Sequence, residues 1–261
     1  MDILQAVIIA IVEGITEFLP ISSTGHMIIA SSLMGIEKEE FTKLFTVAIQ
    51  LGAILAVVVL YWRKFFDFTK WQFYLKLIVA VIPALVIGGL LSDKIDALLE
   101  SPTTVAITLV LGGFVLLFID RFFKGSSIDE EPGVSYPKAF MIGLWQCVAM
   151  IPGVSRSAAT IIGGMQQGLT RRLAAEFSFF VAVPTMAAAT GYKLLKSYDS
   201  ITSDSIKLLA IGNIVAFIVA IVAIKFFIGF LQKYGFRLFG WYRIIAGIIL
   251  LILIWQGVIN E

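Results

Sequence analysis

The sequence has few charged residues, a single cysteine and a single histidine. Asp, Glu, Lys and Arg make up 15% of its 261 residues, whereas soluble domains carry about 25%. Because Cys147 has no second cysteine to pair with, a disulfide framework and a cysteine-rich metal site are excluded. The formal net charge is only +2, so we expect no nucleic-acid partner. The first residues also lack the pattern of a cleavable signal peptide, and we expect none.

Hydrophobic residues are abundant instead, and they come in long runs. They make up 59% of the chain, and the mean hydropathy is +0.96. No charged residue interrupts 105–119, 208–224 or 244–254. Runs of this length are typical of helices that cross a lipid bilayer. The chain is therefore predicted to be an all-α polytopic membrane protein.

Two regions are apolar but interrupted. In residues 3–34, Pro20 stops a first helix, and a following serine can cap a second one. In residues 139–167, the pair Pro152-Gly153 stops a helix and Ser155 can open the next. Each piece is short, because a full crossing takes about 20 residues. We therefore expect two re-entrant helical hairpins.

Three uninterrupted segments follow each hairpin. The six predicted transmembrane helices are 44–62, 77–92, 102–120, 177–195, 207–229 and 240–258. Since three is an odd number, the two halves would enter the membrane with opposite orientation. The chain is thus predicted to be one integral domain built as an inverted-topology repeat of residues 1–124 and 125–261. Such repeats place their site where the broken helices meet.

The positive charges of the loops predict how the repeat is oriented in the membrane. The predicted topology places more Lys and Arg residues on one side of the membrane than on the other, and Arg243 is counted on the side that has more. The positive-inside rule assigns that side to the cytoplasm. Both termini are then expected outside.

Glu13 and Glu17 are four residues apart, so they share one helix face. Ionisable groups within a membrane segment are expensive and usually functional. Two such carboxylates can hold a divalent cation or divide between ionised and protonated roles. The alternative is a helix edge that faces water.

A cluster of polar residues follows at the start of the second helix. Ser22, Ser23 and Thr24 can cap that helix, or hold an anion together with its free N–H groups and positive dipole end. Gly25 would let a ligand approach the backbone closely. His26 could act as a general acid, a general base or a nucleophile, or be a structural hydrogen-bonding group.

Arg156 is the matching residue of the second hairpin, because it also lies at a predicted helix start. Arginine binds phosphate through two parallel hydrogen bonds. Ser155 and Ser157 would add hydroxyl donors. The alternative is a resting ion pair with Glu13 or Glu17, for which a phosphate would have to compete.

Other polar residues are weaker candidates. Three glutamines are expected to line the same cavity: Gln50, Gln146 and Gln166. Glu176 and Ser178 begin the span after two arginines, and we expect them at the membrane interface.

Two motifs resemble the bacitracin-resistance type of undecaprenyl-diphosphate phosphatase. They are EGITEFLPISSTGH at 13–26 and PGVSRS at 152–157, where the family usually continues with glycine and this chain has Ala158. The likeness also covers 45–61 and 177–184, and it extends over essentially the whole chain. It implies a multi-pass enzyme of the bacterial inner membrane, with six spans, two re-entrant hairpins and an active site facing the extracytoplasmic side.

The resemblance also implies a reaction. The enzyme would remove the terminal phosphate of undecaprenyl diphosphate, which regenerates the monophosphate carrier for cell-wall synthesis and confers bacitracin resistance. It implies a divalent cation, Mg or Ca, as cofactor. The family's key positions carry over to Glu13, Glu17, Ser23, His26 and Arg156, with Ser22, Thr24, Ser155 and Ser157 in support. Membrane lipids are expected partners, and a homodimer is a candidate assembly.

Two questions stay open at the level of the sequence. The attacking group could be Ser23, His26 or water. A different class of function is a transporter or flippase of isoprenyl phosphate or another anion, since inverted repeats with broken helices are typical of transporters.

Overall fold

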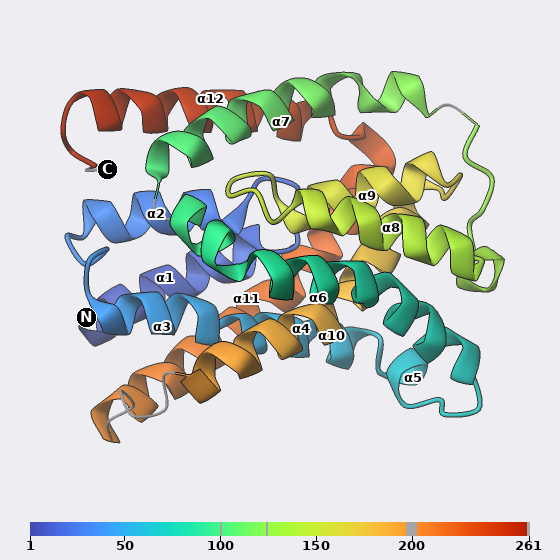
Figure 1. Cartoon of the computed structure of the whole chain (residues 1–261), viewed down its shortest axis with the longest axis horizontal. Coiled ribbons are helices and arrows are strands. Elements are labelled where there is room, and N and C mark those ends of the chain that lie inside the picture. The colour runs from blue at the N-terminus through green and yellow to red at the C-terminus, as the bar shows by residue number, and fades with distance from the viewer. Residues whose placement is uncertain (100, 124, 197–202, 260–261) are drawn as a thin grey trace.

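The computed structural model describes residues 1–99, 101–123, 125–196 and 203–259 (Figure 1). The chain is all-α, as predicted. The described part adds only a short 3₁₀ helix at Glu131–Gly133 and one isolated bridge between Ile128 and Leu169. The helices are α1 (Ile3–Thr16), α2 (Ser23–Leu33), α3 (Glu40–Ala48), α4 (Gln50–Leu60), α5 (Trp62–Phe65), α6 (Trp71–Leu99), α7 (Pro102–Phe122), α8 (Tyr136–Val148), α9 (Arg156–Gln166), α10 (Arg171–Lys196), α11 (Ser203–Tyr234) and α12 (Arg237–Trp255).

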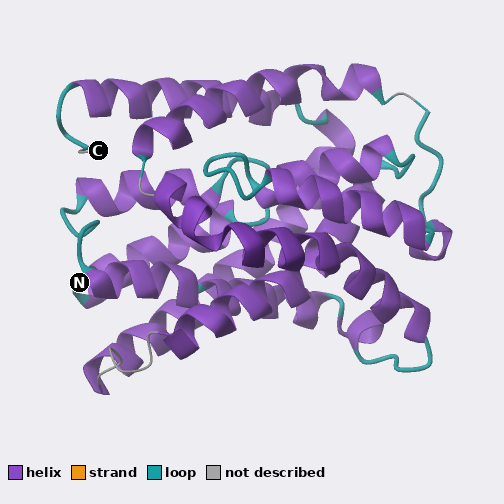
Figure 2. Cartoon of the chain, in the orientation of Figure 1, coloured by secondary structure: helices purple, strands orange, loops and turns teal. Residues whose placement is uncertain are grey.

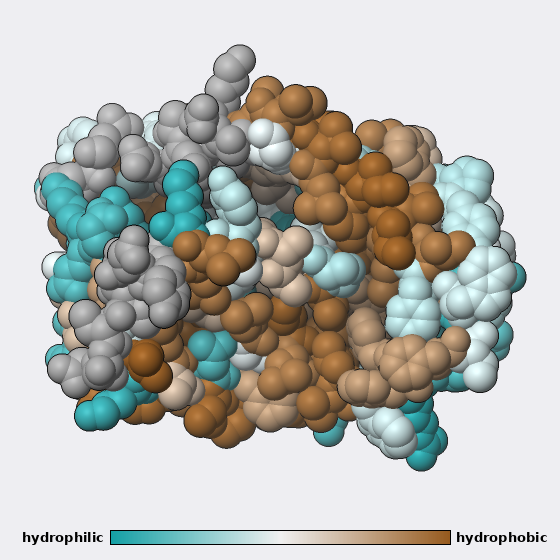
Figure 3. Space-filling view, turned by 60° about the horizontal axis from the view of Figure 1, so that its bottom comes forward, coloured by the Kyte–Doolittle hydropathy of each residue, from teal (hydrophilic) through white to brown (hydrophobic). Residues whose placement is uncertain are grey.

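Six segments of the described chain are long and apolar enough to cross a membrane, which confirms the predicted number. They are Glu40–Leu60, Trp71–Leu91, Pro102–Phe122, Arg171–Lys196, Ser205–Tyr234 and Arg237–Trp255. Hydrophobic side chains cover the middle of the face in Figure 3, and most hydrophilic ones gather towards its two edges. That distribution suits a belt of lipid around the middle of the molecule.

The first span differs from its predicted form, because α3 and α4 meet at a break near Ile49. The side chain of Asn213, on α11, accepts a hydrogen bond from the Gly52 N–H at 2.7 Å. Within a continuous helix that N–H would bond to the carbonyl four residues earlier. A side chain inserted in this way interrupts a helix. The partner is 161 residues away in the chain, so the local sequence could not reveal it.

The second span is also longer than predicted. Residues 93–99, which follow the predicted span 77–92, belong to α6, whose helical geometry is interrupted at Leu91 (φ −117°, ψ 15°). The bend divides the apolar part of α6 from its acidic end. Residue 124, the expected end of the first half, lies outside the described residues.

The helices pack in pairs that cross between the two halves. α7 lies alongside α12 over most of its length, α1 packs against α11, and α8 packs against α6 (Figure 1). Gly113 and Gly240 let α7 and α12 approach closely, since a Cβ atom on either would lie within 2.8 Å of the other's carbonyl oxygen. Small residues play this role in many membrane helix pairs.

The two broken pairs, α1–α2 and α8–α9, lie inside this framework. Their helices have 14, 11, 13 and 11 residues, or about 16–21 Å at 1.5 Å per residue, which is less than the hydrocarbon thickness of about 30 Å. Figure 2 shows loops in the middle of the helices, away from both ends. The two chain termini lie at the same end of the molecule in Figure 1.

Candidate active site

Ser22 and Ser155 precede α2 and α9, and both have an unusual backbone. Their φ angles are 68° and 74°, and no other non-glycine residue in the described ranges has a positive φ. This region is sterically disfavoured for L-residues. Each serine caps its helix, because its hydroxyl oxygen accepts from the N–H three residues later: Gly25 at 3.4 Å and Ala158 at 3.2 Å. The two breaks therefore share one local structure.

The serine caps leave backbone N–H groups at both helix starts without a hydrogen-bond partner. In the described part of the chain, the backbone N–H groups of Ser23, Thr24, Arg156 and Ser157 have no recorded hydrogen-bond partner. A helix start with free N–H groups is a ready anion site. Both breaks line one cavity of about 170 Å³, which is bounded by Glu17, Ser22, Ser23, Thr24, Gln50, Ala149, Met150, Pro152, Gly153, Ser155, Arg156 and Met186.

Glu17 joins the two breaks in this cavity. One of its oxygens lies 2.9 Å from Arg156 Nη2, and the other accepts a hydrogen bond from Ser23 Oγ at 2.5 Å. The ion pair is largely shielded from solvent, with side chains 14% and 7% exposed. The resting ion pair expected for Arg156 is therefore present with Glu17. The structure thus brings the guanidinium of Arg156 to the carboxylate of Glu17, which is 139 residues away in the chain and also binds the Ser23 hydroxyl.

Arg156 is held on its other side by α10. Its Nη1 donates to the Ser178 carbonyl at 3.2 Å and lies 3.4 Å from the Ser178 hydroxyl, which Thr160 contacts at 2.6 Å. The guanidinium carbon lies 5.7 Å from the centre of the Phe18 ring. Its Nε is buried and has no partner among the described residues. Ser178, which was expected at the membrane interface, is fully buried beside Arg156.

Ser157 has a structural contact. Its fully buried hydroxyl donates to the Phe18 carbonyl at 2.7 Å, which ties the start of α9 to the first break. The hydroxyl is therefore already used, and only the backbone N–H of Ser157 is available to a ligand.

Glu13 lies one turn before Glu17 on α1. Its side chain is 1% exposed, and neither carboxylate oxygen has a partner among the described residues. A buried carboxylate without a partner is costly. Mg²⁺ and Ca²⁺ prefer oxygen ligands, and Mg²⁺ is often held by one or two carboxylates plus water and phosphate. The two glutamates therefore fit a cation of this kind, although no group of three or more His, Cys, Asp or Glu occurs in the described residues.

Glu13 lines a second, larger cavity of about 880 Å³. This outer cavity adjoins the first, because Ser23, Thr24 and Gln50 line both. Within the described structure, the side chains of Thr24 and Gln50 have no hydrogen-bond partner. Both are thus available to a ligand.

The other two glutamines of the sequence prediction do not line these cavities. Gln146 bonds Thr185 at 3.2 Å, and Gln166 accepts from Trp145 Nε1 at 2.6 Å. Only Gln50 is positioned as expected.

His26 faces a different neighbour. Its Nδ1 lies 2.7 Å from the Ser22 carbonyl, and its Nε2 lies 2.6 Å from the Tyr242 hydroxyl. Because a carbonyl only accepts, Nδ1 carries the proton, and in the neutral ring Nε2 accepts from Tyr242. The described structure records no contact between His26 and Glu13 or Glu17.

Arg243 was missed as a site residue. It is fully buried, and its five N–H donors meet five backbone carbonyls at 2.8–3.3 Å. These carbonyls belong to Pro20 in the first break, Gly153 and Val154 in the second, and Thr108 and Leu109 on α7. Arginine has five donors, so every one is satisfied. Arg243 thus clamps the two breaks to each other and to α7.

The place of Arg243 corrects the reading of the loop charges, which counted it on the cytoplasmic side. It lies within α12, between the two breaks. The sequence did contain a sign that Arg243 belongs to the site, because it is a charged residue inside an otherwise apolar span. Gly112 makes room for it, since a Cβ atom there would lie 2.3 Å from Arg243 Nη2.

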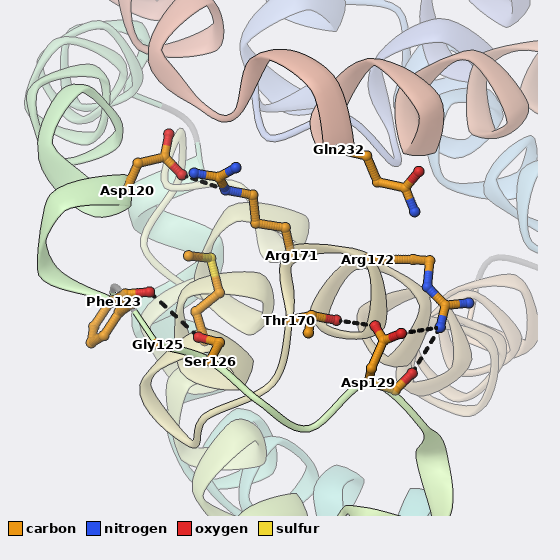
Figure 4. Close-up of a pocket in the computed structure, with 10 residues that line it drawn as sticks. Asp120, Phe123, Gly125, Ser126, Asp129, Thr170, Arg171, Arg172 and Gln232 are labelled. Carbon is orange, nitrogen blue, oxygen red and sulfur yellow. Dashed lines mark hydrogen bonds and ion pairs between the residues drawn. The ribbon is translucent and has the colours of Figure 1, made fainter.

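A further pocket of about 530 Å³ lies where α7 ends and α10 begins (Figure 4). Its arginines are paired: Arg171 Nε with Asp120 at 2.7 Å and Arg172 Nη2 with Asp129 at 2.9 Å. The Thr170 hydroxyl and Arg172 both donate to Asp129, and these bonds lower the pKa of its carboxyl. Both arginines of this pocket are therefore ion-paired, and neither helix break lines it.

Sequence comparison with known proteins identifies the family of this chain. A family model described as bacitracin resistance protein BacA matches residues 6–249. A protein named undecaprenyl-diphosphatase from Flavobacterium psychrophilum is 62% identical, over 97% of this chain and 96% of its own. Proteins of the same name from Bdellovibrio bacteriovorus and Aquifex aeolicus are 54% and 47% identical, over 98% and 94% of this chain and 98% and 96% of their own. The chain therefore belongs to the bacitracin resistance protein BacA family.

Proposed function

We propose that this protein is an undecaprenyl-diphosphatase of the bacterial plasma membrane. It hydrolyses undecaprenyl diphosphate to undecaprenyl phosphate and inorganic phosphate. Family membership and the name shared by its relatives support the substrate. The observation that carries the chemistry is the contact of Glu17 with both Ser23 and Arg156 between two helix starts.

The diphosphate binds where the two breaks meet. Arg156 offers a guanidinium with a free Nε–H, and the starts of α2 and α9 offer four free backbone N–H groups. Because the site is largely shielded from solvent, these donors act more strongly on phosphate oxygens than they would in water. Most of the rate acceleration comes from this positioning and charge stabilisation, as is general for phosphoryl transfer.

The substrate also activates the nucleophile. As phosphate oxygens take over Arg156, one oxygen of Glu17 is released from its ion pair, while the other keeps its contact with the Ser23 hydroxyl. Ser23 then transfers its proton to Glu17, and its Oγ forms a bond to the terminal phosphorus while the bond to the bridging oxygen breaks. Undecaprenyl phosphate leaves. Water next attacks the phosphoserine, which restores the Ser23 hydroxyl and releases inorganic phosphate.

Glu13 and Glu17 are the residues that would hold a divalent cation, Mg or Ca. Such a cation supplies positive charge that offsets the charge of the phosphate oxygens. The unpaired oxygens of buried Glu13 support this assignment.

His26 has a supporting part in this proposal. Both of its nitrogens are engaged, with Ser22 and Tyr242, so its lone pair is not free for attack. It holds the carbonyl of Ser22 and thereby the turn that presents Ser23. Rapid-quench trapping distinguishes the nucleophiles: a phosphoenzyme is expected in His26→Ala and not in Ser23→Ala. A phosphoenzyme that disappears only in His26→Ala would assign the attack to histidine, and none in any variant would assign it to water.

The two halves are proposed to be an inverted repeat of residues 1–124 and 125–261, with two re-entrant hairpins. Ser22 and Ser155 share backbone and capping geometry. The packing of the two halves is also reciprocal: the first helix of each half packs on a long helix of the other half, α1 on α11 and α8 on α6. The hairpins would open to the extracytoplasmic side.

Orientation can be tested with single cysteines. In a Cys147→Ser background, Lys38→Cys should react with a membrane-impermeant maleimide in intact cells, and Lys70→Cys should react only after lysis. The reverse pattern would contradict the proposed orientation.

Purified protein in a neutral detergent tests the function. Phosphate release from undecaprenyl diphosphate is expected with Mg²⁺ or Ca²⁺, and it should be lost in Glu17→Ala and Arg156→Ala. Glu130→Ala should keep it, because Glu130 lines neither of the two cavities. If the wild-type protein releases no phosphate with any cation, the transporter or flippase of an isoprenyl phosphate becomes the better account.

A further inference from the structure

The outer cavity of about 880 Å³ has a basic rim that the reaction does not use. Lys38 comes from the turn between α2 and α3, and Lys193 comes from α10, so they reach the cavity from different parts of the chain. Within the described structure neither has an ion-pair partner. Lys43 also lines the cavity, but it pairs with Glu40 at 3.2 Å. Two positive charges are therefore unengaged at the rim.

The walls below the rim are rich in hydroxyl groups. The residues that carry them are Ser23, Thr24, Ser31, Ser32, Thr42 and Thr46. Ser31 is bonded to its own helix, and Thr42 and Thr46 make local bonds, whereas Thr24 stays free. Since Ser23, Thr24 and Gln50 belong to both cavities, polar side chains connect the outer cavity with the one that Arg156 lines.

Carboxylates also line the two cavities. Glu13 lies buried in the wall of the outer cavity and Glu17 in that of the smaller one, whereas Lys38 and Lys193 are exposed. Glu37, next to Lys38 in the chain, is the other carboxylate of the outer cavity. The two lysines bring positive charge to this wall. An ammonium group is compact, strongly hydrated and mobile, which suits brief contact better than tight binding.

We propose that Lys38 and Lys193 form an outer phosphate subsite, which holds a phosphate group of the substrate or product outside the reaction site. The ligand is a phosphate anion, either the headgroup of the lipid diphosphate on its way in or free inorganic phosphate on its way out. This inference rests on the proposed function. It adds a second, weaker anion site to the one made by Arg156.

Charge reversal at both lysines tests the subsite by turnover. In Lys38→Glu/Lys193→Glu, KM for undecaprenyl diphosphate is expected to rise about tenfold at low salt, with kcat within about twofold of wild type. The effect should shrink at about 0.5 M salt, because exposed charges are then screened within a few ångströms. Lys196→Glu is the matched control, since Lys196 ends the same helix but does not line the cavity. Lys38→Arg/Lys193→Arg should stay near wild type.

Two arms separate the sources of the phosphate. A higher KM assigns the subsite to the incoming headgroup. A higher inhibition constant for inorganic phosphate, also by about tenfold, assigns it to the outgoing product. An unchanged KM and an unchanged inhibition constant, both equal to those of Lys196→Glu, would overturn the proposal.

A binding measurement separates this inference from the proposed function. In Arg156→Gln protein, which should not turn over, the outer subsite is intact. Equilibrium binding of radiolabelled inorganic phosphate should persist there, weaken with salt and be lost on adding Lys38→Glu/Lys193→Glu. Lack of turnover in wild-type protein would defeat the proposed function but leave this result interpretable. Salt-independent binding that the lysines do not affect would defeat the subsite.

Discussion

Glu17 and Arg156 each contact more than one partner, and the reaction is proposed to depend on exchanging these contacts for contacts with the substrate. Glu17 contacts Arg156 and Ser23 at the same time. In the proposed mechanism, phosphate takes over Arg156, and Glu17 keeps its contact with Ser23 and accepts the proton of that hydroxyl.

Glu17→Gln keeps the shape of the side chain and removes its charge. We expect kcat for phosphate release to fall by about 10²–10⁴-fold, the usual contribution of a general base. Glu130→Gln should have no effect, because Glu130 lines neither of the two cavities. A Glu17→Gln enzyme with more than about a tenth of wild-type kcat would show that Glu17 is not the base.

Arg243→Lys provides a test of the clamp. Lysine has three donors, so at least two of the five carbonyls lose their partner, at about 1–3 kcal/mol each. The free energy of unfolding in detergent should fall by about 2–6 kcal/mol. Arg237→Lys is the control, because Arg237 is exposed at the start of the same helix. Equal stability of the two variants would mean that Arg243 does not hold the breaks together.

At the scale of helices, the sequence predicts well wherever the cause is local. A proline followed by serine marked both breaks, and the serines do cap α2 and α9. The break at Ile49 could not be foreseen, because it is made by Asn213. Glu17, Ser23 and Arg156 were predicted as site residues from their polarity in apolar segments, and the structure brings the three side chains together. Ser178 and Arg243 were missed because their partners come from distant helices.

Two ion pairs near the start of α6 allow a matched comparison. Lys76 and Glu131 lie 2.7 Å apart with side chains 7% and 9% exposed, whereas Lys70 and Asp67 lie 2.9 Å apart with side chains 65% and 29% exposed. Lys76→Met should destabilise the protein by about 3–5 kcal/mol, because it leaves a buried carboxylate unpaired. Lys70→Met should cost less than about 1 kcal/mol. Chemical unfolding in detergent measures both, and equal losses would contradict the account.

The connection from α7 to α8 should respond to acid. Hydrogen bonds from Thr170 and Arg172 lower the pKa of Asp129 below its ordinary value. A carboxyl with a lowered pKa stabilises the fold above its unfolded pKa, and this contribution is lost as pH falls through the folded value. Asp129→Asn should remove this part of the pH dependence below about pH 4. Identical acid unfolding curves for the variant and wild type would contradict it.

For the whole molecule, we propose that the arrangement of helices makes polarity within the membrane tolerable. α11 packs on α1, α7 on α2 and α6 on α8, and the polar turns of the two short pairs line one cavity. Arg243 satisfies the turn carbonyls, and Arg156 neutralises Glu17. Glu13 stays without a partner in the described structure. That imbalance is what a substrate with its cation is proposed to correct.

The central claim is that the two breaks form one site, and a double-mutant cycle tests it most directly. Phosphate release from undecaprenyl diphosphate is measured for wild type, Ser23→Ala, Arg156→Ala and the double variant. Residues that act as a unit are strongly non-additive. We predict that each single variant loses nearly all activity and that the double variant is no slower than the worse single one. Losses that simply multiply, or a single variant that stays active, would contradict the account.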